Sequence, residues 1–192
     1  MKQKILVLAL LAILSAMCIT GTFAYFATDY DAHNVVASGG IHIEVILKEL
    51  DSQGVEVDAD SFELDKIMPG VPEDRILRFR NKGNNSMWLR TSISYKIVGT
   101  DGNELPLVKD GNSLVWHVAN TKDWKLHSDG FYYYNSEVES GGQTENLFEE
   151  INFHGSMGNE YTNCKIILTV LTHAVQSQHN GESALEAVGW SE

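Results

Sequence analysis

Apolar and polar residues alternate with a period of two over much of the chain beyond residue 40. In the first such segment, Ile41 to Leu47, isoleucine, valine and leucine occupy the odd positions, with His42 and Glu44 between them. Alternation of this kind predicts a β-strand with one buried face. The same pattern predicts further strands at residues 77–80, 89–97, 114–118, 131–134, 147–153 and 164–175.

Turn-forming sequences separate these predicted strands. Glycine recurs there with asparagine, aspartate or proline, at residues 51–54, 69–70, 81–85, 101–103, 110–112, 128–130 and 141–142. Only residues 112–125 and 183–188 are expected to contain a turn of helix. Many short strands joined by such turns are typical of antiparallel sandwiches. We therefore predict an all-β fold for residues 41–192, an antiparallel jelly roll or β-sandwich with few short helices.

The first 24 residues follow a different pattern. Lys2 and Lys4 precede an apolar run from residue 5 to residue 20, and the small residues Thr22 and Ala24 follow it. This layout predicts an N-terminal signal-peptide helix that is cleaved between Ala24 and Tyr25. The alternative is an uncleaved membrane anchor, because the run approaches the ~20 residues that span a bilayer. We expect a secreted protein of the cell surface or extracellular matrix, which meets the membrane only through its uncleaved signal.

Composition narrows the classes of partner. Removal of the leader takes away Lys2 and Lys4 and no acidic residue, so the formal charge changes from −12 to −14. A basic partner or a divalent cation fits this charge better than nucleic acid does. Cys164 is then the only cysteine, which excludes an intramolecular disulfide and is common in bacterial surface proteins.

The residues that often carry catalysis are not arranged as a site. The sequence contains neither His-Glu-x-x-His nor Gly-x-Ser-x-Gly, and its seven histidines are scattered. The closest pair, His173 and His179, could be ligands but is more simply explained as surface or strand-edge histidines. Cys164 lies in an alternating apolar strand, which predicts a buried, inert thiol rather than a nucleophile. We predict no catalytic residue, no metal site and no cofactor.

Two clusters allow a binding interpretation beside a structural one. Five carboxylates fall within ten residues and form either a weak divalent cation site or a solvated acidic hairpin, namely Glu56, Asp58, Asp60, Glu63 and Asp65. The spacing lacks the glycine and terminal glutamate of a helical-hand calcium loop, which favours the hairpin. The aromatic residues Trp124 and 131–134 form either a binding platform or, as alternation favours, part of the core.

The segment behind the predicted cleavage point, residues 25–40, has no strong turn signal before Ser38-Gly39-Gly40. Its larger apolar and aromatic residues are Tyr25, Phe26, Tyr30, Val35 and Val36. A free extended end of this kind can add a strand to the open sheet edge of a neighbouring molecule. It can equally be the first strand of its own sheet, and the pattern alone leaves both open.

Several short motifs resemble the TasA/camelysin family of spore-forming and related bacteria. They are Gly21-Thr22-Phe23-Ala24-Tyr25-Phe26, Asp29-x-Asp31 with Asn34, Ala37-Ser38-Gly39-Gly40-Ile41-His42-Ile43, and Ile67-Met68-Pro69-Gly70 followed by Leu77-Arg78-Phe79-Arg80-Asn81-Lys82-Gly83. Later motifs are similar to a clostridial-type branch of these proteins: Trp124, Gly130-Phe131-Tyr132-Tyr133-Tyr134, Leu147-Phe148, Ala174-Val175-Gln176 and Trp190. The similarity covers nearly the whole chain.

The resemblance implies a jelly-roll domain that a SipW-type signal peptidase releases and that assembles into biofilm matrix or surface fibres. In such fibres the processed N-terminus, here about Tyr25 to Ala37, completes the sheet of the next subunit, so the main partner is the protein itself, with or without accessory matrix proteins. Some members are described as camelysin, a cell-surface metallopeptidase. That activity is the alternative function, although this sequence has no recognisable His and Glu ligand set. A monomeric surface adhesin or binding module is a further alternative.

Overall fold

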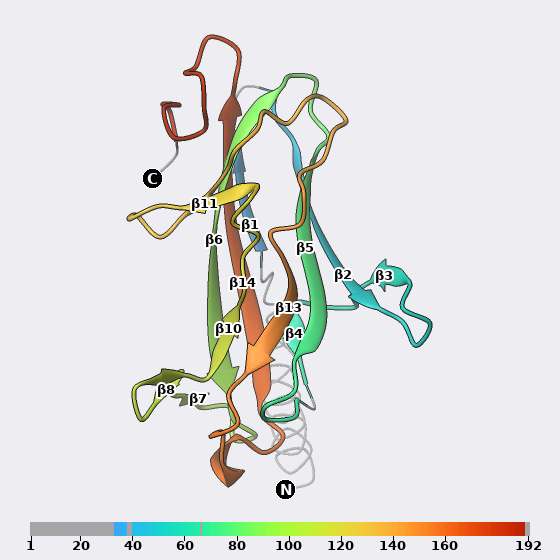
Figure 1. Ribbon diagram of the computed structural model, residues 1–192, viewed down its shortest axis with the longest axis vertical. Coiled ribbons are helices and arrows are strands. Elements are labelled where there is room, and N and C mark those ends of the chain that lie inside the picture. The colour runs from blue at the N-terminus through green and yellow to red at the C-terminus, as the bar shows by residue number, and fades with distance from the viewer. Residues whose placement is uncertain (1–32, 38–39, 66, 191–192) are drawn as a thin grey trace, which may run out of the picture. The chain divides into compact units, whose positions relative to one another are not determined.

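The computed structural model describes residues 33–37, 40–65 and 67–190. The predicted leader and its cleavage point after Ala24 lie outside these residues. Among the described residues, no helix has the length and apolar character that a membrane crossing requires. Residues 32–192 form one compact unit, and its strands are drawn in Figure 1.

Two large β-sheets and one small hairpin make up the described part of this unit. Sheet A has the strand order β1-β14-β6-β12-β11, with β4 also paired to β14 and β7 to β6. Its strands are β1 (His33–Ala37), β4 (Glu63–Leu64), β6 (Met87–Val98), β7 (Glu104–Leu105), β11 (Trp124–Leu126), β12 (Tyr132–Tyr134) and β14 (Lys165–Gln176). Its central pair, β6 and β14, is antiparallel over twelve residues of each strand.

Sheet B faces sheet A and has the order β10-β13-β5-β2-β3. Its strands are β2 (Ile43–Leu50), β3 (Glu56–Asp58), β5 (Glu73–Asn81), β10 (Val115–His117) and β13 (Phe148–Phe153). A separate small hairpin joins β8 (Val108–Lys109) to β9 (Asn112–Ser113). A single 3-10 turn at Asn159–Tyr161 precedes β14.

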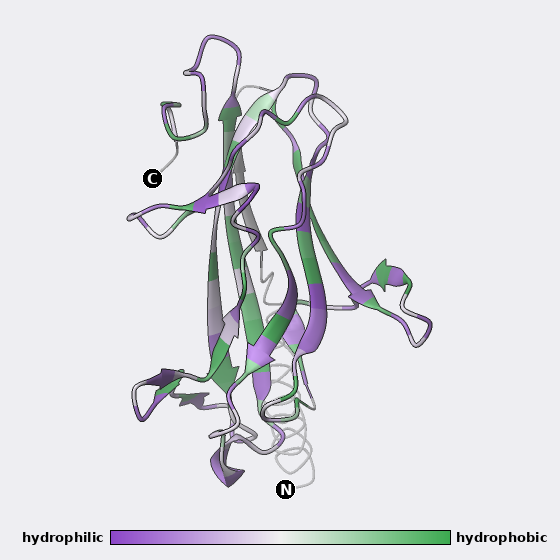
Figure 2. Ribbon diagram, in the orientation of Figure 1, coloured by the Kyte–Doolittle hydropathy of each residue, from purple (hydrophilic) through white to green (hydrophobic). Residues whose placement is uncertain are grey.

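The core lies between the two sheets. Strand β5 shows how the alternation places it: Leu77 and Phe79 are fully buried, whereas Arg78 lies on the outer face. Figure 2 shows the same division as hydrophobic and hydrophilic bands along the long strands. At the centre, the ring of Trp124 lies 5.6 Å from that of Phe79 and 5.0 Å from that of Tyr134. The predicted all-β sandwich, built mainly from antiparallel strands, is thereby confirmed, and each of the seven predicted strands is present with shifted ends.

The two predicted helical stretches take other forms. Residues 112–125 contain strands and a turn, because Trp116 and Trp124 pack into sheets. At 183–188, the N–H of Ala187 donates to the carbonyl of Ser183, a single turn that does not continue as a helix. Strand β1 is the other departure, because it pairs parallel with β14, whereas all other strand pairs among the described residues are antiparallel.

Candidate self-assembly site

Strand β1 is the edge of sheet A, and it rests on the outer side of β14. The five residues of β1 are Cα partners of residues 170–174 of β14, so that Val35 is opposite Thr172 and Val36 is opposite His173. Parallel pairs are slightly less stable per residue than antiparallel ones. A short parallel strand at an edge is therefore weakly held compared with the long central pair.

The same edge of β14 carries a second short strand. Leu64 and Glu63 of β4 pair with Ile166 and Ile167, and the N–H of Leu168 donates to the carbonyl of Phe62 at 2.9 Å. This edge of β14 is thus covered in two sections, the first by β4 and the second by β1. Departure of β1 alone would uncover the backbone of residues 170–174, which is a ready template for another strand.

Strand β14 itself is firmly held. Val170, Thr172 and Ala174 are buried in the interior of the sandwich. The hydroxyl of Thr91 in β6 donates to the carbonyl of Leu171 at 3.1 Å and lies 3.0 Å from the hydroxyl of Thr172. The edge that β1 covers is therefore rigid, whichever strand occupies it.

The chain is fixed again immediately after the segment that links β1 to sheet B. Gly40 has a φ of +77°, a conformation that glycine adopts without strain. The N–H of Lys82 donates to the carbonyl of His42 at 2.7 Å, and Gly83 lies against the backbone of residues 40–42. Ser38-Gly39-Gly40 therefore joins a weakly held strand to a fixed point.

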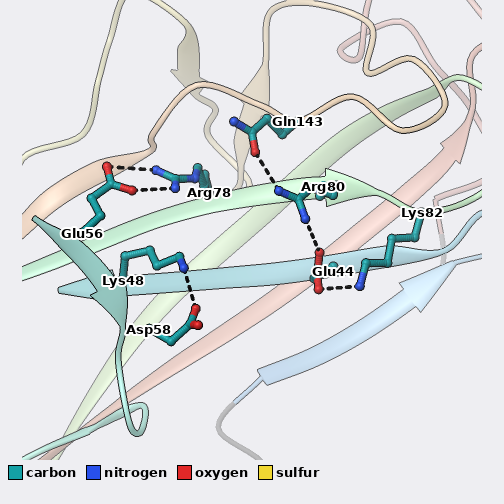
Figure 3. A network of polar contacts seen from close by, with 8 residues as sticks. All are labelled: Glu44, Lys48, Glu56, Asp58, Arg78, Arg80, Lys82 and Gln143. Atoms are coloured by element: carbon teal, nitrogen blue, oxygen red, sulfur yellow. Dashed lines mark hydrogen bonds and ion pairs between the residues drawn. The ribbon is translucent and has the colours of Figure 1, made fainter.

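Charged side chains cover part of the outer face of sheet B (Figure 3). Both carboxylate oxygens of Glu56 accept hydrogen bonds from Arg78, at 2.6 and 3.2 Å, and Asp58 lies 2.6 Å from Lys48. The hydrogen bond from Arg78 lowers the pKa of Glu56. The pair of Arg78 with Glu56 holds β3 to β5, and the pair of Lys48 with Asp58 joins β2 to β3, so both carboxylates are neutralised within the chain.

The outer face of sheet A is covered at one end by the residues after β14. The guanidinium of Arg90 lies 4.3 Å from the ring centre of Phe131 and 4.9 Å from that of Trp190. Tyr133 completes this cluster, since its ring meets Trp190 edge-on at 6.0 Å and its hydroxyl lies 3.1 Å from Arg90. The predicted aromatic platform is thus divided between two faces, because Tyr134 and Trp124 belong to the main core.

One half-buried histidine, His117, has two tyrosine partners. Nδ1 of His117 lies 2.8 Å from the hydroxyl of Tyr95, and Nε2 lies 3.1 Å from that of Tyr132. Burial lowers the pKa of His117 to about 4 and raises the pKa of Tyr95. His117 is therefore neutral and hydrogen-bonded at pH 7, and its half-buried ring lies 4.7 Å from that of Phe148.

The cysteine and the histidine pair considered from the sequence lie in different surroundings. Cys164 is 1% exposed, and burial raises the pKa of its thiol, as expected of an inert cysteine. His173 is buried beside Arg90, whereas His179 is exposed in the loop after β14. In the part of the chain that the structure describes, no group of three or more His, Cys, Asp or Glu side chains could hold a metal ion. The predicted absence of a cofactor and of catalysis stays a prediction.

The five clustered carboxylates are spread over a turn and two strands. Glu56 and Asp58 belong to β3 and Glu63 to β4, where it lies 2.9 Å from Lys165. Asp60 and Asp65 line a polar hollow into which Arg75 and Lys165 also project. Cations of the protein already share this hollow. The five carboxylates do not form a single hairpin, because β3 belongs to sheet B and β4 to sheet A.

Only two of the predicted assembly residues lie within the described part of the chain. Val35 and Val36 belong to β1. The others lie outside the described residues, namely Ala24, Tyr25, Phe26 and Tyr30. The sequence did not reveal the strand edge at residues 170–174, because alternation fixes the faces of a strand but not its neighbours. No family model matches the sequence, and comparison with curated proteins and with solved structures finds no match either.

Proposed function

We propose that this protein is a secreted structural protein of the cell surface or extracellular matrix that assembles into fibres by strand exchange. The donor is the segment from Tyr25 to Ala37, freed when a SipW-type signal peptidase cleaves after Ala24. The acceptor is the edge of β14 from Val170 to Ala174, which β1 covers within a single chain.

The observation that carries this proposal is the pairing of β1 with β14. Strand β1 is short, lies at an edge and is parallel to its neighbour, so its release costs little compared with that of the long central strands β6 and β14. In an exchanged state it would form the same backbone hydrogen bonds with the β14 of another molecule. Exchange of an identical element is a low-cost route to association for this reason.

The link between β1 and β2 supports the same proposal. Ser38-Gly39-Gly40 can redirect the chain because glycine accepts a wide range of backbone angles. Beyond it, Gly83 and Lys82 hold residues 40–42 in place. The donor segment can therefore change its direction and pair with a neighbouring molecule while the rest of the sandwich keeps its structure. A head-to-tail exchange that does not close on itself produces a filament.

Two proteins that differ in their first residue test the proposal. A protein that begins at Tyr25 is expected to polymerise into fibres visible by electron microscopy, and one that begins at Gly40 is expected not to. Single substitutions V35P and V36P in the longer protein provide a second test that retains the chain length. Proline has no N–H to donate to the neighbouring strand. Only every second residue of a strand donates its N–H to a given neighbour, so one of these two adjacent substitutions removes a hydrogen bond between the donor and β14. At least one of the two variants should therefore assemble more slowly.

The proposal is wrong if the longer and shorter proteins remain monomeric alike over a range of concentration, pH and calcium. A monomeric binding module would then be the better account. Casein hydrolysis that a chelator abolishes and zinc restores would instead support the peptidase alternative.

A further inference from the structure

The outer face of sheet B has two parts that differ in how their acidic side chains are neutralised. In the part shown in Figure 3, Glu44 accepts hydrogen bonds from Arg80 and Lys82, at 3.2 and 2.5 Å. Glu56 and Asp58 are likewise paired with cations, as described above. Every carboxylate drawn there has a basic partner within the chain.

The other part of this face is a groove of about 460 Å³, which lies between the β2–β3 hairpin and the segments around β10 and β13. Ile76 and Phe148 form its buried floor. Leu50 and Val118 line it as well, although they are 40% and 66% exposed. Apolar side chains thus remain open to solvent within a recess large enough for a ligand side chain.

Three carboxylates surround this apolar surface, those of Asp74, Glu149 and Glu150. No lysine, arginine or histidine lines the groove, and in the described residues none of the three carboxylates forms an ion pair. Within the described part of the chain, Glu149 accepts a hydrogen bond from the side-chain amide of Asn146 at 3.1 Å and Glu150 accepts one from that of Asn152 at 3.3 Å, and both donors are uncharged. The groove therefore combines an apolar floor with negative charge that the protein does not neutralise.

Arg78 positions both walls of the groove. Its guanidinium binds Glu56 of the hairpin on one side and donates to the side-chain oxygen of Asn146 at 3.2 Å on the other. Asn146 in turn donates to Glu149. The hairpin that carries Leu50 and the loop that carries Asn146 are thereby held at a fixed separation.

We propose that this groove binds an extended basic segment of a partner protein, with a lysine or arginine side chain lying across it. The aliphatic stem of such a side chain would pack on Leu50 and Val118, and its charged end would reach Glu149, Glu150 or Asp74. A cation with an apolar stem matches both properties of the groove. A bare metal ion would leave the apolar floor uncovered, and a nucleic acid would be repelled by the carboxylates. The proposal does not depend on fibre formation.

Binding of a labelled peptide tests the proposal on the folded protein. The probe is fluorescein-Gly-Val-Lys-Pro-Lys-Val-Gly, and its matched partner has glutamine in place of both lysines. Fluorescence anisotropy should show binding of the lysine peptide and not of the glutamine peptide. Two exposed ion pairs are lost in the variant E149Q/E150Q, so its affinity for the lysine peptide should fall by about fivefold or more.

Two matched controls separate this site from general attraction to an acidic protein. The variant E139Q/E182Q removes the same amount of charge from exposed positions outside the groove lining and should bind the lysine peptide as the unaltered protein does. The variant V118S should weaken binding, whereas V188S, at a residue 73% exposed elsewhere, should not. Melting curves of all four variants are expected to match that of the unaltered protein, since the substituted side chains are exposed.

Several results would overturn the proposal. One is an equal loss of affinity in E149Q/E150Q and E139Q/E182Q, which would indicate non-specific attraction. Another is equal binding of the glutamine peptide. A third is calcium binding that blocks the peptide and that E149Q/E150Q abolishes, which would assign the groove to a cation.

Discussion

Gly83 lies directly against Gly40, across the turn that starts sheet B. A Cβ atom at position 83 would stand 2.8 Å from the carbonyl oxygen of Gly40 and 2.8 Å from the amide nitrogen of His42. Both neighbours are backbone atoms, so no flexible side chain could yield. This contact fixes the chain where the link from β1 ends, and the proposed exchange requires such a fixed point.

The substitution G83A should therefore destabilise the protein by about 2–4 kcal/mol, because the backbone of residues 40–42 must move away from the new methyl group. The free energy of unfolding in urea measures this loss. Gly155 is a matched control, since a Cβ there meets nothing within 4 Å. G155A should change the stability by less than about 1 kcal/mol. An equal effect of both substitutions would contradict the close approach.

Asn81 should be among the most sensitive polar residues of the interior. It is fully buried, its amide donates to the carbonyls of Asn85 and Val138 at 2.8 and 3.0 Å, and its oxygen accepts the N–H of Gly83 at 2.9 Å. N81A leaves several buried groups unpaired and should cost about 2–4 kcal/mol in a denaturant titration. N135A, which removes one exposed hydrogen bond, should cost less than about 1 kcal/mol. A small effect of N81A would show that the turn does not depend on this side chain.

The lowered pKa of His117 predicts that the free energy of unfolding decreases in mild acid. Burial lowers the pKa of the folded state to about 4, below the usual 6.5, so the folded protein binds this proton less readily than the unfolded chain does. The stabilisation is complete above about pH 6.5, falls as the pH decreases, and is lost below about pH 4. The total change attributable to this residue is about 3 kcal/mol. Urea titrations from pH 7 to pH 4 measure it.

The variant H117F isolates this contribution from other groups. Burial and Arg90 also lower the pKa of His173, and hydrogen bonds from lysine and arginine lower those of Glu44 and Glu56, so acid destabilises the protein through them as well. The slope of the unfolding free energy against pH is proportional to the number of protons taken up on unfolding. Between pH 4 and 6.5, H117F should lower that number by up to one. H179Q, at an exposed histidine, should leave it unchanged. An unchanged slope in H117F would show that the pKa of this histidine is not lowered in the folded protein.

The alternation of residues predicted the sandwich because one face of each long strand is buried. The rule worked for Leu77 and Phe79, which are fully buried, with the partly exposed Arg78 between them on the opposite face. It was less informative for β14, where His173 and Val175 on the outer face are buried too. The residues after β14 cover that face, and a pattern within one strand cannot show what another segment covers.

The candidate sites could be predicted only in part. Val35 and Val36 were identified as strand residues from their composition, but their partner at residues 170–174 depends on strand order, which sequence does not fix. The groove was missed for a similar reason, because Leu50, Asp74, Val118 and Glu149 come from distant parts of the chain. In the sequence, Val118 continues the alternating pattern of a short predicted strand, but in the structure it is exposed. An apolar residue at the end of such a strand was the one available sign of this groove.

The substitution W190A should release the covering segment after β14 without unfolding the sandwich. Trp190 contacts Arg90 and Tyr133, and an interaction of this kind contributes about 0.5–2 kcal/mol. Hydrogen exchange followed by mass spectrometry should show faster exchange in residues 177–190 and unchanged protection in β6 and β14. V188A, at an exposed position of the same segment, is the control. Faster exchange throughout the protein would instead mean that Trp190 supports the whole fold.

Strand exchange is tested most directly by disulfide formation between different molecules. Asn34 and Leu171 are Cα partners in the pairing of β1 with β14, a position at which a disulfide can form. Two proteins that begin at Tyr25 and lack Cys164, one with N34C and the other with L171C, would be mixed under assembly conditions and oxidised. Strand exchange should produce a disulfide-linked dimer of the two variants within the fibres, identified by mass spectrometry of the linked peptides. Fibres in which this link never forms, while the double variant N34C/L171C closes its disulfide within one chain, would contradict it.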